Sequence, residues 1–150
     1  MSPYLDRAAI AALIPHAGSM CLLDAVEAWD ATRIACRAVS HRDAVNPLRH
    51  DGQLAALHAI EYGAQAMALH AGLLGARDAK PASGYLVAVR DAEFFVDRLD
   101  TVADDLMVSA ERQHGDAQVL QYTFALRAGD IELARGRLTA RIGRLDPSGP

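Results

Sequence analysis

Cysteine is scarce in this sequence: the 150 residues include only two, Cys21 and Cys36. They lack the close Cys/His spacing of a zinc site, so we expect no metal centre. Both lie in apolar stretches, which predicts buried, reduced thiols.

Lysine is also scarce, with Lys80 as the only one, and acidic residues outnumber basic ones to give a formal net charge of −4. The arginines are spread along predicted strands and form no basic stripe. Such a stripe is the electrostatic footprint of nucleic-acid binding. We therefore expect no nucleic-acid partner.

Segments that could enter a membrane are lacking as well. The apolar run 8–14 resembles the core of a signal peptide, but it is short and stops at Pro15. The run 54–74 reaches the length of a membrane span, about 20 residues, but polar side chains interrupt it and no aromatic belt flanks it. We expect a cytoplasmic protein without a membrane anchor.

What the sequence does have is apolar content. Hydrophobic residues make up 51% of the chain, which excludes disorder for most of its length and provides a core for one domain. We expect a single domain over residues 1–144. The residues that follow, 145–150, should form a disordered tail.

Alternating apolar and polar residues predict strands on both sides of one helix. Two strands are expected over 20–27 and 32–39, a third over 84–96, and three more in the remainder of the chain, mostly linked by tight turns. Consecutive strands joined by hairpins form an antiparallel sheet. The pattern therefore predicts a two-layer α+β domain in which the sheet wraps the helix.

The predicted helix, residues 54–74, is the most informative segment. It is apolar on nearly every face and has one carboxylate, Glu61, near its middle. A helix that is apolar all round belongs in a core. Burying a carboxylate is costly unless the group is paired, hydrogen-bonded or protonated. Glu61 is therefore a candidate functional residue, although it could also lie at the helix edge and reach solvent.

Two motifs carry a resemblance to a known family. Residues 13–16 (Leu-Ile-Pro-His) followed by 22–24 (Leu-Leu-Asp), and residues 60–65 (Ile-Glu-Tyr-Gly-Ala-Gln), resemble motifs of the β-hydroxyacyl-acyl carrier protein dehydratases. In that family the second motif reads Ile-Glu-Ala-Met-Ala-Gln and carries the catalytic carboxylate. The segments 46–52 and 61–70 resemble a divergent, dehydratase-like branch associated with aryl polyene assembly. The resemblance implies the hotdog fold, an antiparallel sheet around one long central helix.

The sequence departs from this family at one important position. The family's catalytic histidine would fall at Pro47, beside Asn46, and no histidine stands there. A Pro-Gly pair at the start of the family's helix, whose glycine amide binds the thioester oxygen, falls on Ala55 and Ala56. We expect the amide of Ala56 to be available in its place.

Dehydration requires one group to remove a proton from the carbon beside the thioester and another to protonate the departing hydroxyl. The resemblance assigns the first role to a histidine and the second to Glu61. His16 matches the opening motif and is the leading candidate base. Gln65, one helical turn after Glu61, is expected to orient that carboxylate or to contact a partner subunit. The candidates are Glu61 and His16 as catalytic residues, with Asn46, His50, Ala56, His58 and Gln65 as substrate-binding residues.

These observations favour a dehydratase of 3-hydroxyacyl thioesters on acyl carrier protein, in fatty acid or polyene biosynthesis, with no metal or redox cofactor. The active sites would lie at the interface of a dimer, as the resemblance implies. One alternative is a non-catalytic or half-catalytic partner of a second hotdog subunit, which the missing histidine favours. Another is an acyl thioesterase whose helical carboxylate activates water.

Overall fold

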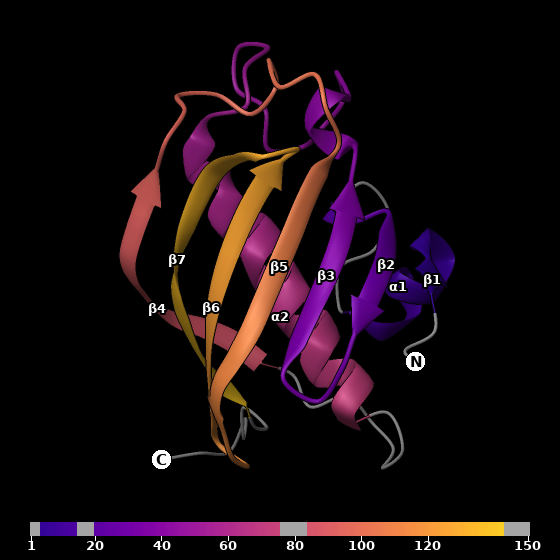
Figure 1. The fold of residues 1–150 in the computed structure, drawn as a ribbon, viewed down its shortest axis with the longest axis vertical. Coiled ribbons are helices and arrows are strands. Elements are labelled where there is room, and N and C mark those ends of the chain that lie inside the picture. The colour runs from indigo at the N-terminus through magenta and orange to yellow at the C-terminus, as the bar shows by residue number, and fades with distance from the viewer. Residues whose placement is uncertain (1–3, 15–19, 76–83, 143–150) are drawn as a thin grey trace, which may run out of the picture.

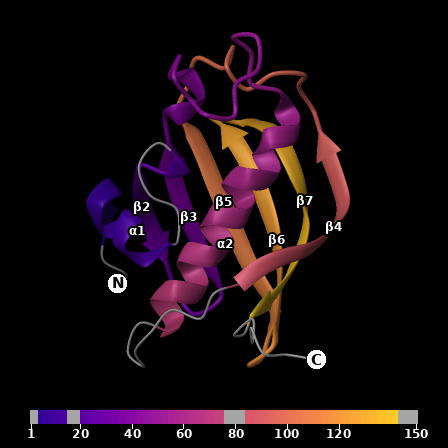
Figure 2. The ribbon, with the colours of Figure 1, turned by 180° about the vertical axis from the view of Figure 1, so that it is seen from behind.

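The computed structural model describes residues 4–14, 20–75 and 84–142. One seven-stranded antiparallel sheet, in the order β1-β2-β3-β5-β6-β7-β4, forms its larger layer (Figure 1). The long helix α2 (Ala59–Gly75) crosses the strands diagonally on one face, and the sheet curves around it (Figure 2). The prediction of an α+β hotdog arrangement is confirmed.

The strands follow the expected alternation. Inward-facing residues of β6, such as Tyr122 and Phe124, are buried beneath α2, while their neighbours are more exposed. The strand that follows α2 pairs with β7 rather than with β5, so it forms an edge of the sheet. The principal strands are β2 (Ala25–Trp29), β3 (Arg33–Ala38), β4 (Gly84–Phe94), β5 (Leu106–Gly115), β6 (Val119–Ala128) and β7 (Ile131–Ile142).

The N-terminal elements differ from expectation. The structure adds β1 (Leu5–Asp6) and helix α1 (Arg7–Leu13), for which no element was predicted. Asp6 caps α1, since its carboxylate accepts a hydrogen bond from the amide of Ala9 at 3.0 Å. A two-residue strand and a seven-residue helix are too short for a periodic pattern to reveal them.

Two boundaries also move. The first predicted strand begins at Ala25 instead of residue 20, because Met20 and Leu22 bond to a side chain of α2. The helix begins after Leu54, with the 3-10 turn η3 (Ala56–His58) leading into α2. Leu54 instead accepts a backbone hydrogen bond from Leu99 at 2.8 Å.

The two cysteines are free and buried, as the sequence predicted. Burial raises the pKa of Cys36 to about 12, so this thiol stays protonated. Among the described residues no group of side chains could hold a metal ion. No described helix is long and apolar enough to cross a membrane.

Candidate functional site

Glu61 lies in the first turn of α2 and is half-buried. It shares a partly exposed stripe of the helix with Ile60, Ala64 and Ala68, which are spaced as one helical face. Within the described part of the chain its carboxylate makes no hydrogen bond or ion pair. A carboxylate on an otherwise apolar stripe is therefore available to a ligand or a partner.

Three histidines are among the predicted site residues, His16 as the base and His50 and His58 as substrate-binding residues. His58 ends η3 one turn before Glu61 and is half-buried, so these two side chains share one side of the helix start. His50 is followed by a tight turn at Asp51 and Gly52, and its side chain is 92% exposed. His16 lies outside the described residues.

His70 is committed to the core on another side of α2. Its Nε2 lies 2.7 Å from the carbonyl oxygen of Asp30, and its Nδ1 lies 2.6 Å from the hydroxyl of Tyr122. Because a carbonyl only accepts, Nε2 carries the proton and Nδ1 accepts from Tyr122. Burial lowers the pKa of His70, which favours this neutral form.

His41 lies between β3 and α2, in the 3-10 turn Ser40–Arg42, and it is fully buried. Its Nε2 lies 3.0 Å from the carbonyl oxygens of both Val102 and Asp104, so it fastens the 102–105 segment to the molecule. Burial lowers its pKa as well.

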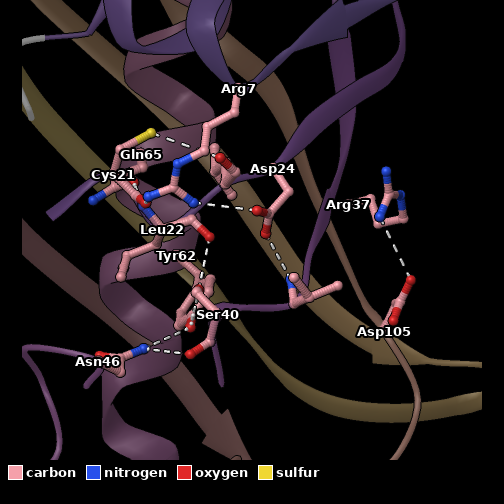
Figure 3. A network of polar contacts seen from close by, with 12 residues as sticks. Arg7, Cys21, Leu22, Asp24, Arg37, Ser40, Asn46, Tyr62, Gln65 and Asp105 are labelled. Atoms are coloured by element: carbon pink, nitrogen blue, oxygen red, sulfur yellow. Dashed lines mark hydrogen bonds and ion pairs between the residues drawn. The ribbon is translucent and has the colours of Figure 1, made fainter. Parts of the chain in front are cut away.

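Asn46 has internal partners for its whole side chain, and Figure 3 shows the two bonds of its Nδ2. Its Nδ2 donates to the carbonyl of Ser40 at 2.9 Å and to the hydroxyl of Tyr62 at 3.3 Å, and its Oδ1 accepts from the amide of Leu48 at 2.9 Å. The residue is buried. Both amide protons are thus used within the protein.

The amide of Ala56 is also occupied, contrary to the expectation that it is available. It donates to the carbonyl of Asp97 at 2.9 Å, because Ala55 forms a β-bridge with Arg98 just ahead of the helix. In this arrangement the amide of Ala56 cannot polarise a thioester oxygen.

Gln65 is fully buried, and both ends of its amide bond to the segment before β2. Its Oε1 accepts from the amide of Leu22 at 2.9 Å, and its Nε2 donates to the carbonyl of Met20 at 2.7 Å. Gln65 therefore anchors α2 to that segment, and these bonds replace the expected contact with Glu61.

Sequence reasoning missed Tyr62, whose ring is completely buried. The hydroxyl of Ser40 donates to the carbonyl of Leu22 at 2.7 Å, which uses its only proton. The Tyr62 hydroxyl, 2.7 Å from Ser40 Oγ, must therefore be the donor in that contact. The available signal was the departure at this position, where the family motif has alanine.

Asp24, the acidic residue of the opening motif, has a structural role as well. Its carboxylate accepts from the amide of Val39 at 2.7 Å and forms an ion pair with Arg7 at 3.2 Å. Beside it lies a small surface hollow of about 100 Å³, with Asn46 and Pro47 in its lining. Glu61 does not line this hollow, so the position expected for the family's histidine opens onto a different space.

The chain matches one protein family. Residues 8–144 match the ApeP-like family model, described as ApeP dehydratase. No curated protein is similar enough in sequence to count as a relative.

Several solved structures share the fold. A chain of the dehydratase heterocomplex ApeI:P from Xenorhabdus doucetiae superimposes with a TM-score of 0.81, at 24% identity over 91% of each chain. AziG from S. sahachiroi gives 0.57, at 21% identity over 89% of this chain and 99% of that one. Zebra fish thioesterase superfamily member 2 gives 0.61, at 13% identity over 91% and 95%.

Proposed function

Since the chain belongs to the ApeP-like dehydratase family, we propose that it is the carboxylate-bearing subunit of a dehydratase for 3-hydroxyacyl thioesters of acyl carrier protein. The pathway would be polyene or fatty acid biosynthesis. The protein would work in the cytoplasm, where thiols such as those of Cys21 and Cys36 stay reduced. The observation that carries the proposal is the half-buried, unpartnered carboxylate of Glu61 on the apolar stripe of α2.

The proposed reaction is an elimination. A base removes a proton from the carbon next to the thioester carbonyl, and the electron pair of that C–H bond forms the double bond. The C–O bond to the hydroxyl breaks at the same time, and Glu61 supplies the proton with which this group departs as water.

The base is proposed to come from a second hotdog subunit. His41 and His70 are committed to carbonyl and hydroxyl partners, and His50 lies on an exposed turn. His58 lies on the same side of the helix start as Glu61. It is the alternative base if the chain works without a second subunit. The heterocomplex from Xenorhabdus doucetiae supports a second subunit, because its name describes a dehydratase assembled from two components.

The edge strand β4 supports the same partner. Leu86, Val89 and Phe94 stand opposite buried residues of β7 and so face the side of the sheet that α2 occupies. The helix packs mainly on β3, β5 and β6, however, and β4 curves away beyond it (Figure 2). These three side chains remain at least 36% exposed, and an uncovered edge strand can pair with another chain.

The experiment is a dehydration assay on 3-hydroxyacyl thioesters of acyl carrier protein. It compares the chain alone, the chain co-expressed with a histidine-bearing hotdog dehydratase subunit, and the same complex with Glu61→Gln. We expect dehydration only in the wild-type complex, and a loss of kcat of about 100-fold or more in the variant. Co-purification of Glu61→Gln with the second subunit is the control for assembly.

Two outcomes would contradict the proposal. Equal activity of wild type and Glu61→Gln would remove the carboxylate from the chemistry. Release of free thiol without an unsaturated product would show that the chain is an acyl thioesterase, the activity named for several structures of the same fold.

A further inference from the structure

One departure from the dehydratase motifs contacts the neighbour of another in this structure. Tyr62 stands where the helix motif has alanine, and Asn46 lies beside Pro47, where the histidine would fall. Their side chains are in contact, 3.3 Å apart (Figure 3). We propose that Tyr62 is a positioning residue for Glu61, a role that rests on the proposed function.

The contacts form a directed chain in which each proton has an acceptor. Asn46 Nδ2 donates to Tyr62 Oη, Tyr62 Oη donates to Ser40 Oγ at 2.7 Å, and Ser40 Oγ donates to the carbonyl of Leu22. The Tyr62 hydroxyl is the central link. Without it, a proton of Asn46 loses its acceptor and Ser40 Oγ loses its donor, at a place where Tyr62 and Asn46 are buried and Ser40 is half-buried.

This chain acts on the part of α2 that carries Glu61. Tyr62 is the next residue, and Gln65 follows one turn later with its bonds to Met20 and Leu22. Together the two side chains fix the rotation of α2 and its position along its axis relative to Leu22 and Ser40. Glu61 has no described partner of its own, so its carboxylate is placed by the backbone that these bonds hold.

The same contacts involve the loop around Pro47, where the histidine is missing. The loop that carries the base in the dehydratases is tied to the helix in this chain, because Asn46 donates to Tyr62 and also to the carbonyl of Ser40. In this chain the loop with Asn46 therefore helps to hold the part of α2 that carries Glu61. A misplacement of about 1 Å can cost a reaction about 100-fold, so small shifts of α2 should be visible in the rate.

The test compares Tyr62→Phe with Tyr122→Phe in the assembled wild-type complex described above. Both substitutions remove one hydroxyl from a fully buried tyrosine that bonds to a polar side chain, and Tyr122 contacts α2 at His70, far along the helix from Glu61. We expect similar losses of Tm. Only Tyr62→Phe should lower kcat, by about tenfold, with KM unchanged.

Equal kcat values for the two variants would overturn the positioning role and leave the proposed function in place. Should Tyr62→Phe fail to fold, Ser40→Ala removes the acceptor of the same hydroxyl, and it should lower kcat in the same way. If the wild-type complex shows no dehydration, or if Glu61→Gln matches wild type, both the proposed function and the positioning role fail.

Discussion

At the residue scale, the absence of a side chain at Gly63 determines how closely the sheet approaches α2. A Cβ at this position would lie 2.6 Å from Cδ2 and Cγ of Phe124, much closer than atoms can pack. On the other side of the ring, a Cβ at Gly136 would lie 2.9 Å from Phe124 Cε1. Phe124 is thus held between two glycines, one in the helix and one in β7.

We therefore expect Gly63→Ala to lower the free energy of unfolding by about 2 kcal/mol, the typical cost of overpacking a core. Helix propensity alone predicts the opposite change, because alanine in a helix interior is favoured over glycine by about 1 kcal/mol. A loss of stability would therefore point to the contact with Phe124. Urea denaturation would measure the change. Gly75→Ala is the control, since a Cβ at Gly75 would meet nothing within 4 Å. A loss of stability in the control alone would contradict the close packing of Gly63 on Phe124.

At the scale of elements, the two edge strands of the sheet differ in length and in exposure. β1 pairs with β2 and α1 follows it directly, so one edge is shortened to two residues. The other edge, β4, is long and has two irregularities in its pairing, one of them at Asp91, whose φ is 53°. Its apolar side chains remain exposed in the single chain, which makes β4 the edge at which a second subunit is expected.

The double variant Val87→Lys, Val89→Lys should disrupt that association without unfolding the chain. Both side chains are exposed, at 47% and 36%, so lysines are tolerated in the free chain, but an ammonium group is costly to bury in an interface. We expect affinity for the second subunit to fall by about tenfold or more, measured by titration calorimetry. Ile131→Lys, at a 64% exposed position at the start of β7, should leave the affinity unchanged.

At the scale of the whole molecule, buried histidines join segments that are distant in sequence. His41 fastens the 102–105 segment beside β3, and His70 joins α2 to the turn between β2 and β3 and to β6. Burial lowers the pKa of both below the ordinary value of 6.5, so both are neutral in the folded state. Unfolding exposes them to water and restores their ordinary affinity for protons.

The stability of the chain should therefore decrease as the pH falls from 7 to 5. In this window the unfolded state binds more protons than the folded state, so each histidine can contribute a slope of up to about 1.4 kcal/mol per pH unit. Urea denaturation at several pH values would measure it. His70→Gln should flatten the dependence, because it removes one of these two buried histidines. A stability that is constant between pH 7 and 5 would contradict the neutral assignment.

The sequence by itself determined the architecture and the position of the carboxylate. Period-two patterns predicted the sheet, since alternate side chains of a half-buried strand must differ in polarity, and an apolar run of helical length predicted the central helix. The pattern around Glu61 singled out that residue because one carboxylate among apolar neighbours breaks the pattern. The short elements α1 and β1 were missed because they have too few residues to show a hydrophobic periodicity.

Only the tertiary structure decided which polar groups are free. Asn46, Gln65 and the amide of Ala56 were reasonable candidates for a substrate, but each bonds to a group more than five residues away in the sequence. The partners of Tyr62 likewise come from loops that reach it through the fold. Hydrogen bonds satisfy whichever donors and acceptors the chain brings together, and that proximity is set by packing, which no local pattern encodes.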